Sequence, residues 1–482
     1  MTKVVFVCNS SKIHSYLYLC ITSLLKSFYD LKIFFVIDKD CQPINIEFND
    51  FIDFVDHRYS NFILNPFDFI EVTSYDSIKI MDSIDQIDKC DWIILENNNF
   101  DYSRYENIAN NGIIALDFDF SELKKSFFKK RILKLNINVK KSNQSNWSVF
   151  SKNLKPERGI KNNVSKYLFN FSVYLDYYLK NESKILLSKS KKNKNNNKSY
   201  IVSCFKYYCW LTKHLLFRKF ANAKLRWKIA IKQNDTYHFL TQPEKSFWAD
   251  PFIIQQNNQN FIFFEELKPD GIGAISCLEF DKNFEIIRKE IIIDKAYHLS
   301  FPNVFRHEDN FYMIPESSAN NSLDIYKCSN FPYDWHFHKI LIDKIRLLDP
   351  VLFFHDNIYW IFANKIEDFE QDNNERLYLY FANDLFPENW TSHPQNPIIS
   401  DASLARNAGK IYQKDNKIYR VSQNCSNSYG KNLVVNQITS LTTQHYLEQK
   451  DHEIYPDKKF KGMHTMNFID DLQVFDFLDN RE

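Results

Sequence analysis

Five similar segments recur in the second half of this 482-residue chain, and their spacing limits the fold more than any other feature. Each segment combines a polar or unusual residue, an apolar run, a turn rich in Asn or Asp, and an aromatic run. They are ADPFIIQQNNQNFIFFEE, SFPNVFRHEDNFYMIPES, LDPVLFFHDNIYWIFAN, ARNAGKIYQKDNKIYRVSQ and GMHTMNFIDDLQVFDF. The steps between the marker residues Asp250, Phe301, Asp349, Arg406 and His464 are 51, 48, 57 and 58 residues. Such a period, with several strands per repeat, predicts a five-bladed β-propeller.

Each repeated segment also has the pattern of a β-hairpin. The turns NNQN, HEDN, HDN, KDN and IDD separate alternating apolar stretches, as hairpin loops do. These hairpins are predicted to form the first two strands of each blade, and AISCLEFD, SLDIYKCS and RLYLYFAN supply third strands. Because the innermost strand of a blade lines the central channel, we expect the five markers to converge on the propeller axis.

The first 120 residues follow a different pattern. VVFVC is followed by a helical SKIHSYLYLCITSLLKSF and by LKIFFVID; DWIILE, a helix at about 102–110 and GIIALDF come later. Buried apolar strands joined by helices are typical of a parallel α/β domain. The predicted fold class is therefore an α/β N-terminal domain, residues 1–120, and an all-β five-bladed propeller, residues 226–482.

The segment 121–225 is rich in Lys, Asn and Ser, and KKNKNNNK at 191–198 is too polar to bury. We predict a linker that carries an amphipathic helix at 199–220, where large apolar residues are interspersed with cations. Such a helix can make a peripheral membrane contact, or it can pack one domain against the other. The sequence leaves both alternatives open.

Composition excludes several classes of function. The chain has 61 Lys and Arg against 60 Asp and Glu, so no net field favours nucleic acid. Only 7 glycines are present, and neither G-x-G-x-x-G nor a P-loop occurs. The nine cysteines are scattered without a C-x-x-C spacing, and neither a signal peptide nor an apolar run of ~18 residues is evident. We expect a cytoplasmic protein whose membrane contact is at most peripheral.

Two Asp-Pro pairs mark the predicted starts of inner strands. Asp250 and Asp349 stand at equivalent repeat positions, although a carboxylate is poorly matched to β propensity. A functional carboxylate is one explanation, and an Asp that caps a turn before a Pro-initiated strand is the other. We take both as candidate catalytic residues.

Further candidates stand at the ends of the second strands. Aligning Asn260 with Asn310 places Glu266 opposite Glu316, and the same alignment of the fourth hairpin adds Gln423. Antiparallel strands return to the face where the hairpin began, so these side chains are expected beside the markers. Carboxylates from both strands would supply a general acid and a general base for glycosyl chemistry, and solvated rim carboxylates are the alternative.

Basic residues and histidines are expected at the same mouth. Arg406 and Arg420, near Lys461, add positive charge, and a guanidinium can bind a phosphate leaving group through two hydrogen bonds. His298 and His464 are predicted to face the same region. The alternatives are Arg side chains paired with neighbouring carboxylates and histidines that are hydrogen-bonded core residues.

These residues carry a resemblance to a known family. FWADPF with FFEE, HLSFPNVF with MIPES, DIYKCSNFPYDW, LLDPVLFF, RNAGKIY with YRVSQNCSNSYG, and GMHT resemble the propeller domain of the glucosamine inositolphosphorylceramide transferase family and its bacterial relatives. The resemblance covers about 235–476. That domain is in turn similar to the five-bladed arabinanase and xylosidase glycoside hydrolases.

The resemblance implies roles for individual residues. Asp250 takes the place of the hydrolases' catalytic base, and His464 resembles their ion-binding histidine, which implies an axial Ca²⁺ as a candidate cofactor. The hydrolases' second Pro-Asp is Pro302-Asn303 here, which argues against simple hydrolysis. The first 120 residues resemble formyltransferases, but residues 115–119 read ALDFD where that family has Asn-x-His-Pro-Ser, which implies a degenerate domain.

Three functions remain open. In the first, a glycosyltransferase-like enzyme of bacterial surface glycan assembly takes a sugar donor with a phosphate leaving group and a glycan acceptor; Asp250 deprotonates the acceptor while Arg406 and Arg420 neutralise the phosphate. In the second, a glycosidase uses Asp250 as base and Glu316 as acid. In the third, the propeller only binds sugar or acts as a scaffold.

Overall fold

The computed structural model describes residues 2–8, 10, 12–27, 30–37, 69–71, 78–96, 102–116, 133–154, 160–182, 187–189, 226–243, 246–367, 373–426 and 428–479. The chain divides into two compact units, Met1–Leu211 and Thr212–Glu482. Among the described residues, no helix combines the length and the apolar character needed to cross a bilayer.

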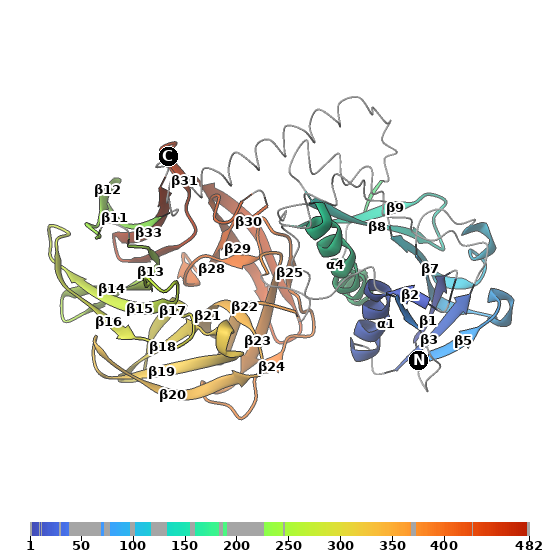
Figure 1. Ribbon diagram of the computed structural model, residues 1–482, viewed down its shortest axis with the longest axis horizontal. Helices are drawn as coiled ribbons and strands as arrows, with labels where there is room; N and C mark the ends of the chain where they lie inside the picture. The colour runs from blue at the N-terminus through green and yellow to red at the C-terminus, as the bar shows by residue number, and fades with distance from the viewer. Residues whose placement is uncertain are drawn as a thin grey trace. The chain divides into compact units, whose positions relative to one another are not determined.

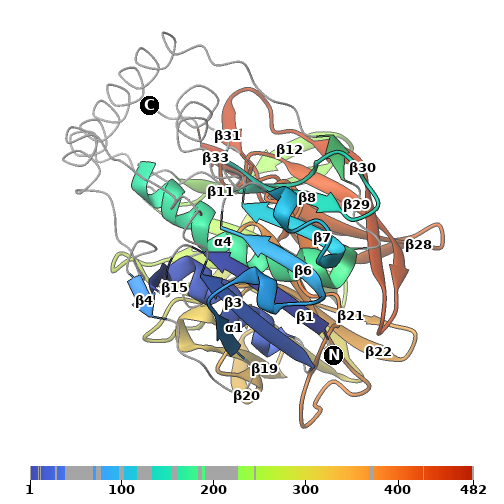
Figure 2. The same cartoon turned by 90° about the vertical axis from the view of Figure 1, so that its right-hand side faces the viewer.

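The N-terminal unit is built on one mixed sheet in the order β10-β9-β8-β7-β6-β1-β3-β5 (Figure 2). Five strands pair in parallel: β1 (Thr2–Cys8), β3 (Leu31–Ile37), β5 (Ile78–Met81), β6 (Cys90–Leu95) and β7 (Ala109–Leu116). The antiparallel strands are β8 (Leu133–Lys141), β9 (Ser148–Leu154) and β10 (Ser188–Lys189), and β2 (Lys12–His14) pairs separately with β4 (Phe69–Glu71). The parallel part agrees with the predicted α/β pattern.

Two helices, α1 (Ser15–Ser27) and α4 (Ile160–Asn181), pack against each other beside this sheet (Figure 1). The prediction that 121–225 is a linker is wrong for the described part, because β8, β9 and α4 belong to the N-terminal unit. Polar residues concealed the apolar positions of α4, such as Leu168, Phe171 and Leu175, which are fully buried. The predicted helix at 102–110 is a short 3₁₀ turn, Tyr102–Arg104, as is Ile84–Gln86. The stretch 199–220 lies outside the described residues.

The C-terminal unit is a five-bladed β-propeller, as predicted (Figure 1). Blade 1 contains β13 (Trp248–Gln256), β14 (Gln259–Leu267), β15 (Gly273–Phe280) and β16 (Ile286–Ile293). Blade 2 contains β17 (Ser300–His307), β18 (Asn310–Glu316), a 3₁₀ turn (Ser318–Asn320), β19 (Ser322–Asn330) and β20 (Asp334–Asp343). Blade 3 contains β21 (Leu347–His355), β22 (Ile358–Lys365), β23 (Arg376–Ala382), β24 (Thr391–Ser392) and β25 (Ile399–Ser400).

The last two blades complete the ring. Blade 4 contains β26 (Arg406–Asn407), β27 (Tyr412–Lys414), β28 (Lys417–Gln423), β29 (Leu433–Leu441) and β30 (Tyr446–Ile454). Blade 5 combines β31 (Phe460–Gly462), β32 (Met466–Ile469) and β33 (Leu472–Asp479) with β11 (Trp227–Gln233) and β12 (Thr236–Phe239) from the start of the unit. The ring is thus closed by antiparallel pairing of β11 with β33, from Trp227 opposite Leu478 to Lys232 opposite Gln473.

The same β-bulge recurs at the start of three inner strands. Asp250, Phe301 and Asp349 have φ values of 53°, 46° and 46°, and the pairing register shifts at each of them. This left-handed conformation costs an L-residue about 1–2 kcal/mol, and a bulge redirects the side chain. Because apolar Phe301 shares the conformation, the bulge belongs to the architecture of the blades. It also determines where the two Asp side chains point.

Candidate active site

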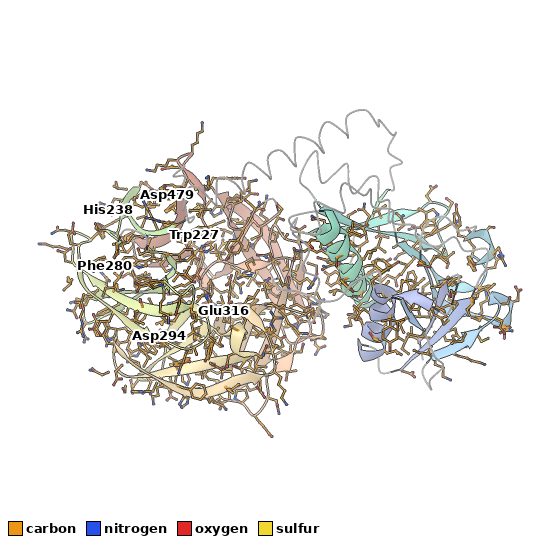
Figure 3. All side chains as sticks on the ribbon, viewed as in Figure 1. Trp227, His238, Phe280, Asp294, Glu316 and Asp479 are labelled. Atoms are coloured by element: carbon orange, nitrogen blue, oxygen red, sulfur yellow. The ribbon has the colours of Figure 1, made fainter. Side chains whose placement is uncertain are left out.

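The starts of the inner strands and the ends of the second strands bring six of the predicted residues together. In Figure 3, Glu316 lies nearer the middle of the propeller than His238 or Phe280 does. Direct contacts join it to the neighbouring blades, because its carboxylate faces Asp349 of blade 3 and Arg406 of blade 4. All six residues are almost completely buried: Asp250, Glu316, Asp349, Arg406, Gln423 and His464.

An ion pair between blades 3 and 4 fixes one side of the site. Arg406 donates from Nε to Asp349 Oδ2 at 2.5 Å and from Nη2 to Asp349 Oδ1 at 3.1 Å. Gln423, directly opposite Arg406 in the sheet, donates to Asp349 Oδ2 at 3.1 Å. Asn407 donates to the backbone carbonyl of Asp349 at 2.8 Å. Two guanidinium N–H groups and an amide therefore fix the position of the Asp349 side chain.

Glu316 of blade 2 lies against this ion pair. Its Oε2 accepts the backbone N–H of Asp349 at 3.0 Å and lies 3.8 Å from Nη2 of Arg406. Burial and the nearby Asp349 carboxylate raise the pKa of Glu316 to about 8, and Arg406 offsets only part of this shift. At neutral pH Glu316 is therefore mostly protonated and can act as an acid.

Asp250 of blade 1 is the second buried carboxyl group. Its Oδ1 accepts the hydroxyl of Thr465 at 2.9 Å, and its Oδ2 accepts the backbone N–H of Phe301 at 3.3 Å. Burial is the main cause that raises its pKa to about 7, against the opposing charge of His464. A carboxyl group with such a pKa can both take up and release a proton near pH 7.

His464 of blade 5 is part of a buried stack and a buried ion pair. Its ring lies flat on the Trp227 indole, with centroids 3.8 Å apart and planes within 6°. Its Nδ1 lies 2.5 Å from Asp476 Oδ2, and its Nε2 lies 3.7 Å from Asp250 Oδ1. Burial opposes a charge on His464, but the carboxylates of Asp476 and Asp250 outweigh it and raise the pKa to about 9. His464 is thus an imidazolium at neutral pH.

Asp250, His464 and Asp476 form the one group of described residues that could hold a metal ion, with ligand atoms within 4.8 Å of one another. Asp476, however, already accepts the backbone N–H groups of Asp250, His464 and Thr465 as well as Nδ1 of His464. Ca²⁺ requires six to eight oxygen ligands. Two carboxylates, one of them saturated with donors, and an imidazolium do not fit the axial Ca²⁺ that the sequence resemblance implied.

The second-strand carboxylate of blade 1 is Glu265, so the prediction for Glu266 is wrong by one residue. The pairing places Glu265 opposite Ala249 and Glu316 opposite Ser300, whereas Glu266 lies opposite Trp248. A shift of one residue moves a side chain to the other face of a strand. Glu266 accordingly pairs with Lys289 at 2.5 Å and accepts the hydroxyl of Ser276 at 2.5 Å, away from the other candidates.

His298 contacts this newly identified carboxylate. Its Nε2 lies 3.1 Å from Glu265 Oε1, and its Nδ1 accepts the backbone N–H of Gly273 at 3.0 Å. The acceptor role of Nδ1 places the proton on Nε2, which donates to Glu265. The His298 side chain remains 39% exposed, so this pair lies at the open edge of blade 1.

Arg420 does not join the site. It is fully buried within blade 4, where Nε and Nη2 bind Glu448 at 2.8 and 2.7 Å and Nη2 also binds the carbonyl of Leu404. Its position in the middle of β28, three residues before Gln423, directs it to β30 and not to the strand end. Lys461 is exposed. Of the predicted cations, Arg406 and His464 alone reach the group, and each is paired with a carboxylate.

Besides Glu265, three more residues of the site escaped sequence reasoning: Trp227, Tyr429 and Asp476. Trp227 comes from the strand that closes the ring, before the first repeat, and Asp476 lies in the weakest repeat. Tyr429 meets the His464 ring edge-on at 5.3 Å and has Arg406 Cζ 5.6 Å from its ring centroid, so it links the two cations. The one available signal was the motif YRVSQNCSNSYG, whose polar second part, NCSNSYG at 424–430, directly follows β28 in the sequence.

Residues 236–473 match the family described as glucosamine inositolphosphorylceramide transferase 1, N-terminal. The resemblance of the propeller to this family is thereby confirmed. Glucosamine inositolphosphorylceramide transferase 1 of Oryza sativa subsp. japonica is 36% identical over 210 residues, and that of Arabidopsis thaliana is 33% identical over 209 residues. Each alignment covers 42% of this chain, but only 28% and 27% of the respective relative. The formyltransferase resemblance of residues 1–120 stays a prediction.

Solved structures with a similar backbone include an α-L-arabinofuranosidase and an α-L-arabinanase. The catalytic domain of Coprinopsis cinerea GH62 α-L-arabinofuranosidase matches with a TM-score of 0.40 and 12% identity, over 54% of this chain and 92% of that chain. The Cellvibrio cellulosa α-L-arabinanase complexed with arabinohexaose matches with a TM-score of 0.33 and 12% identity, over 42% and 77%. At these values the likeness has no bearing on the reaction.

Proposed function

We propose that the propeller is the sugar-binding and proton-transferring part of a glycosyltransferase. One observation carries this proposal: Asp250 and Glu316 are two buried carboxyl groups with pKa values of about 7 and 8, placed around the fixed ion pair of Asp349 and Arg406. The names of the relatives support transfer of a sugar. Since the chain aligns with less than a third of their length, the assignment of transfer to this chain is our inference.

In the proposed reaction, Asp250 takes the proton from an acceptor hydroxyl as its oxygen bonds to the anomeric carbon of the donor. The bond from that carbon to the leaving group breaks, and Glu316 gives its proton to the leaving oxygen. Each carboxyl group has the protonation equilibrium that its role needs near neutral pH. The ion pair of Asp349 and Arg406 keeps Glu316 in place through the backbone N–H of Asp349.

The neutralisation of a phosphate by two arginines finds no support in this geometry. Arg420 lies elsewhere, and Arg406 already binds both oxygens of Asp349. In the proposal, the proton of Glu316 therefore takes over the neutralisation of the leaving group. A donor with a phosphate leaving group remains compatible with this role, because a protonated carboxyl group can donate to an anionic oxygen.

The acceptor class follows from the relatives and not from the site. Their names refer to inositolphosphorylceramide, which favours a sphingolipid-type acceptor over the bacterial surface polysaccharide expected from the sequence. A lipid acceptor would be met at a membrane surface, in line with the proposed cytoplasmic and membrane-peripheral location.

The test is to incubate the purified full chain with a panel of nucleotide sugars and lipid-linked acceptors, and to detect transfer by mass spectrometry. We expect transfer that is lost in Asp250→Asn and Glu316→Gln and retained in Asp309→Asn, a variant at an exposed hairpin tip. Release of sugar from arabinan or xylan without a donor would instead select the glycosidase. Binding of sugar without turnover would select the non-catalytic alternative.

A further inference from the structure

A short segment that is both basic and aromatic runs from the end of β30 in blade 4 into β31 in blade 5. Residues 455–461 read YPDKKFK, and all three lysines are exposed. The ring of Phe460 packs at 5.3 Å on the ring of Phe239, which ends β12 and is 37% exposed. Nζ of Lys459 lies 5.5 Å from the ring centroid of Phe239 and 5.2 Å from that of Phe460. These residues form a basic-aromatic patch: Phe239, Lys458, Lys459, Phe460 and Lys461.

The basic-aromatic patch lies on the same face of the propeller as the candidate active site. In blade 4, Arg406 at the start of the inner strand pairs with Gln423, Gln423 pairs with Leu433, and Leu433 pairs with Ile454. A row of paired residues crosses the strands at one level, so Ile454 lies at the same edge of the blade as Arg406. The segment 455–461 continues directly from Ile454 and therefore leaves the blade on the active-site face.

The backbone attaches this segment to the loop that carries Tyr429. The N–H of Met463 donates to the carbonyl of Gly430 at 2.8 Å. A Cβ at Gly462 would lie 2.2 Å from the same carbonyl oxygen, so this close approach requires a glycine. His464 of the candidate active site follows Gly462 by two residues. The basic-aromatic patch is thus fixed beside the site.

The positive charge of the patch is not cancelled by the carboxylates around it. Asp457 is the one acidic residue of 455–461 and lies 3.9 Å from Nζ of Lys459. Glu453, before the segment, and Asp479, opposite Phe460 in the sheet, form ion pairs of 2.8 and 2.9 Å with lysines outside the patch. Three lysines against one aspartate leave the segment with a net charge of about +2 at neutral pH.

We propose that the basic-aromatic patch binds the surface of a membrane that contains anionic phospholipids. The lysines attract the phosphate groups, and the exposed ring of Phe239 enters the headgroup region, where aromatic side chains are favoured. Aromatic rings beside the cations favour a lipid surface over a soluble anion, which offers no apolar phase. The inference extends the proposed function, in which the acceptor is a lipid, but membrane binding itself requires no sugar transfer.

The test is sedimentation of the full chain with vesicles of pure phosphatidylcholine and of an equal mixture of phosphatidylcholine and phosphatidylserine. The patch variant is Lys458→Gln/Lys459→Gln/Lys461→Gln. The matched control removes the same charge from exposed hairpin ends on the opposite face: Lys282→Gln/Lys414→Gln/Lys417→Gln. Each lysine at an anionic surface contributes about fivefold to binding, so the patch variant should bind the mixed vesicles about 100-fold more weakly. The control should bind them like the wild type.

A wild type that does not sediment with the mixed vesicles would overturn the proposal. Equal binding of the patch variant and the control would also overturn it, because another surface, such as the segment 199–220, would then hold the chain on the membrane. Phe239→Ser should weaken binding at every salt concentration, whereas the contribution of the lysines should decline as salt is raised. Unchanged binding of Phe239→Ser would contradict the insertion of the ring. No outcome depends on enzymatic activity, so a failure here would leave the proposed sugar transfer untouched.

Discussion

Arg406 binds Asp349 with two hydrogen bonds, from Nε at 2.5 Å and from Nη2 at 3.1 Å, and thereby joins blades 3 and 4 beside the proposed acid Glu316. The two side chains are 7% and 3% exposed. An ion pair this deeply buried costs much more when one partner is lost than it contributes as a whole, because the remaining charge has no solvent.

We therefore expect Arg406→Met to lower the free energy of unfolding by about 3–5 kcal/mol. The double variant Arg406→Met/Asp349→Asn should recover part of this loss. Urea denaturation of the wild type, the two single variants and the double variant measures the coupling free energy between Arg406 and Asp349. Arg306→Met, which removes an exposed pair with Asp309, should cost less than about 1 kcal/mol. Equal losses in Arg406→Met and Arg306→Met would contradict the buried pair.

The free energy of unfolding should fall as pH rises from about 5 to 9. This is the opposite of acid denaturation, in which stability falls as pH falls. The folded state raises the pKa of Asp250 from 3.8 to about 7 and that of Glu316 from 4.5 to about 8, so it retains protons that the unfolded chain has released. His464, raised from 6.5 to about 9, contributes stability fully below pH 6.5 and loses it as pH rises through about 9. Each group adds a slope of at most about 1.4 kcal/mol per pH unit within its window.

Urea titrations at several pH values measure this slope. Asp250→Asn and Glu316→Gln should each flatten it in the acidic part of the range, between about pH 4 and 8, while the part due to His464 persists up to pH 9. A wild-type free energy of unfolding that stays level or rises from pH 5 to 9 would show that the folded state does not raise the pKa values of these groups.

The stack of Trp227 on His464 should be needed for ring closure. Trp227 begins β11, which pairs with β33 to complete blade 5, and it is 6% exposed. We expect Trp227→Ala to destabilise the propeller by about 3–5 kcal/mol, through the lost core volume and the lost support of the imidazolium. Phe354→Ala, at a site that is 53% exposed, is the control and should have little effect. Chemical denaturation with tryptophan-independent circular dichroism measures both.

Chelation should leave the propeller unchanged. Asp476 accepts three backbone N–H groups and Nδ1 of His464, so its carboxylate has no acceptor capacity left for Ca²⁺. The melting temperatures in excess EDTA and in millimolar Ca²⁺ are expected to agree. A rise of several degrees with Ca²⁺ that disappears in His464→Gln would require a metal site at these residues.

The repeat predicted the propeller and most of its site, because the number and spacing of the blades determine where each inner strand begins. Asp250, Asp349, Arg406 and His464 were found in this way. Glu265 was missed because aligning turns by identity, Asn260 with Asn310, shifts the register by one residue; the pairing aligns Gln259 with Asn310. In β-strands such a shift exchanges the two faces.

Other parts had no local signal in the sequence. Arg420 and Arg406 look alike as motifs, and only the three-residue offset of Arg420 from the end of β28 places it against Glu448. Trp227 and Asp476 both contact His464, because the first and last strands of the propeller share a blade although they are far apart in the chain. The helix α4 was hidden by its polar composition, although its apolar positions are buried in the N-terminal unit.

The central claim is that Asp250 and Glu316 exchange protons with the substrate, and the pH dependence of the transfer rate in Glu316→Gln tests it most directly. Once a donor and acceptor are known, the account predicts a bell-shaped profile for the wild type with limbs near pH 7 and 8. Glu316→Gln should lose the alkaline limb and about 100-fold or more in kcat, while its fold is retained. A Glu316→Gln variant with the wild-type rate and both limbs would contradict the account.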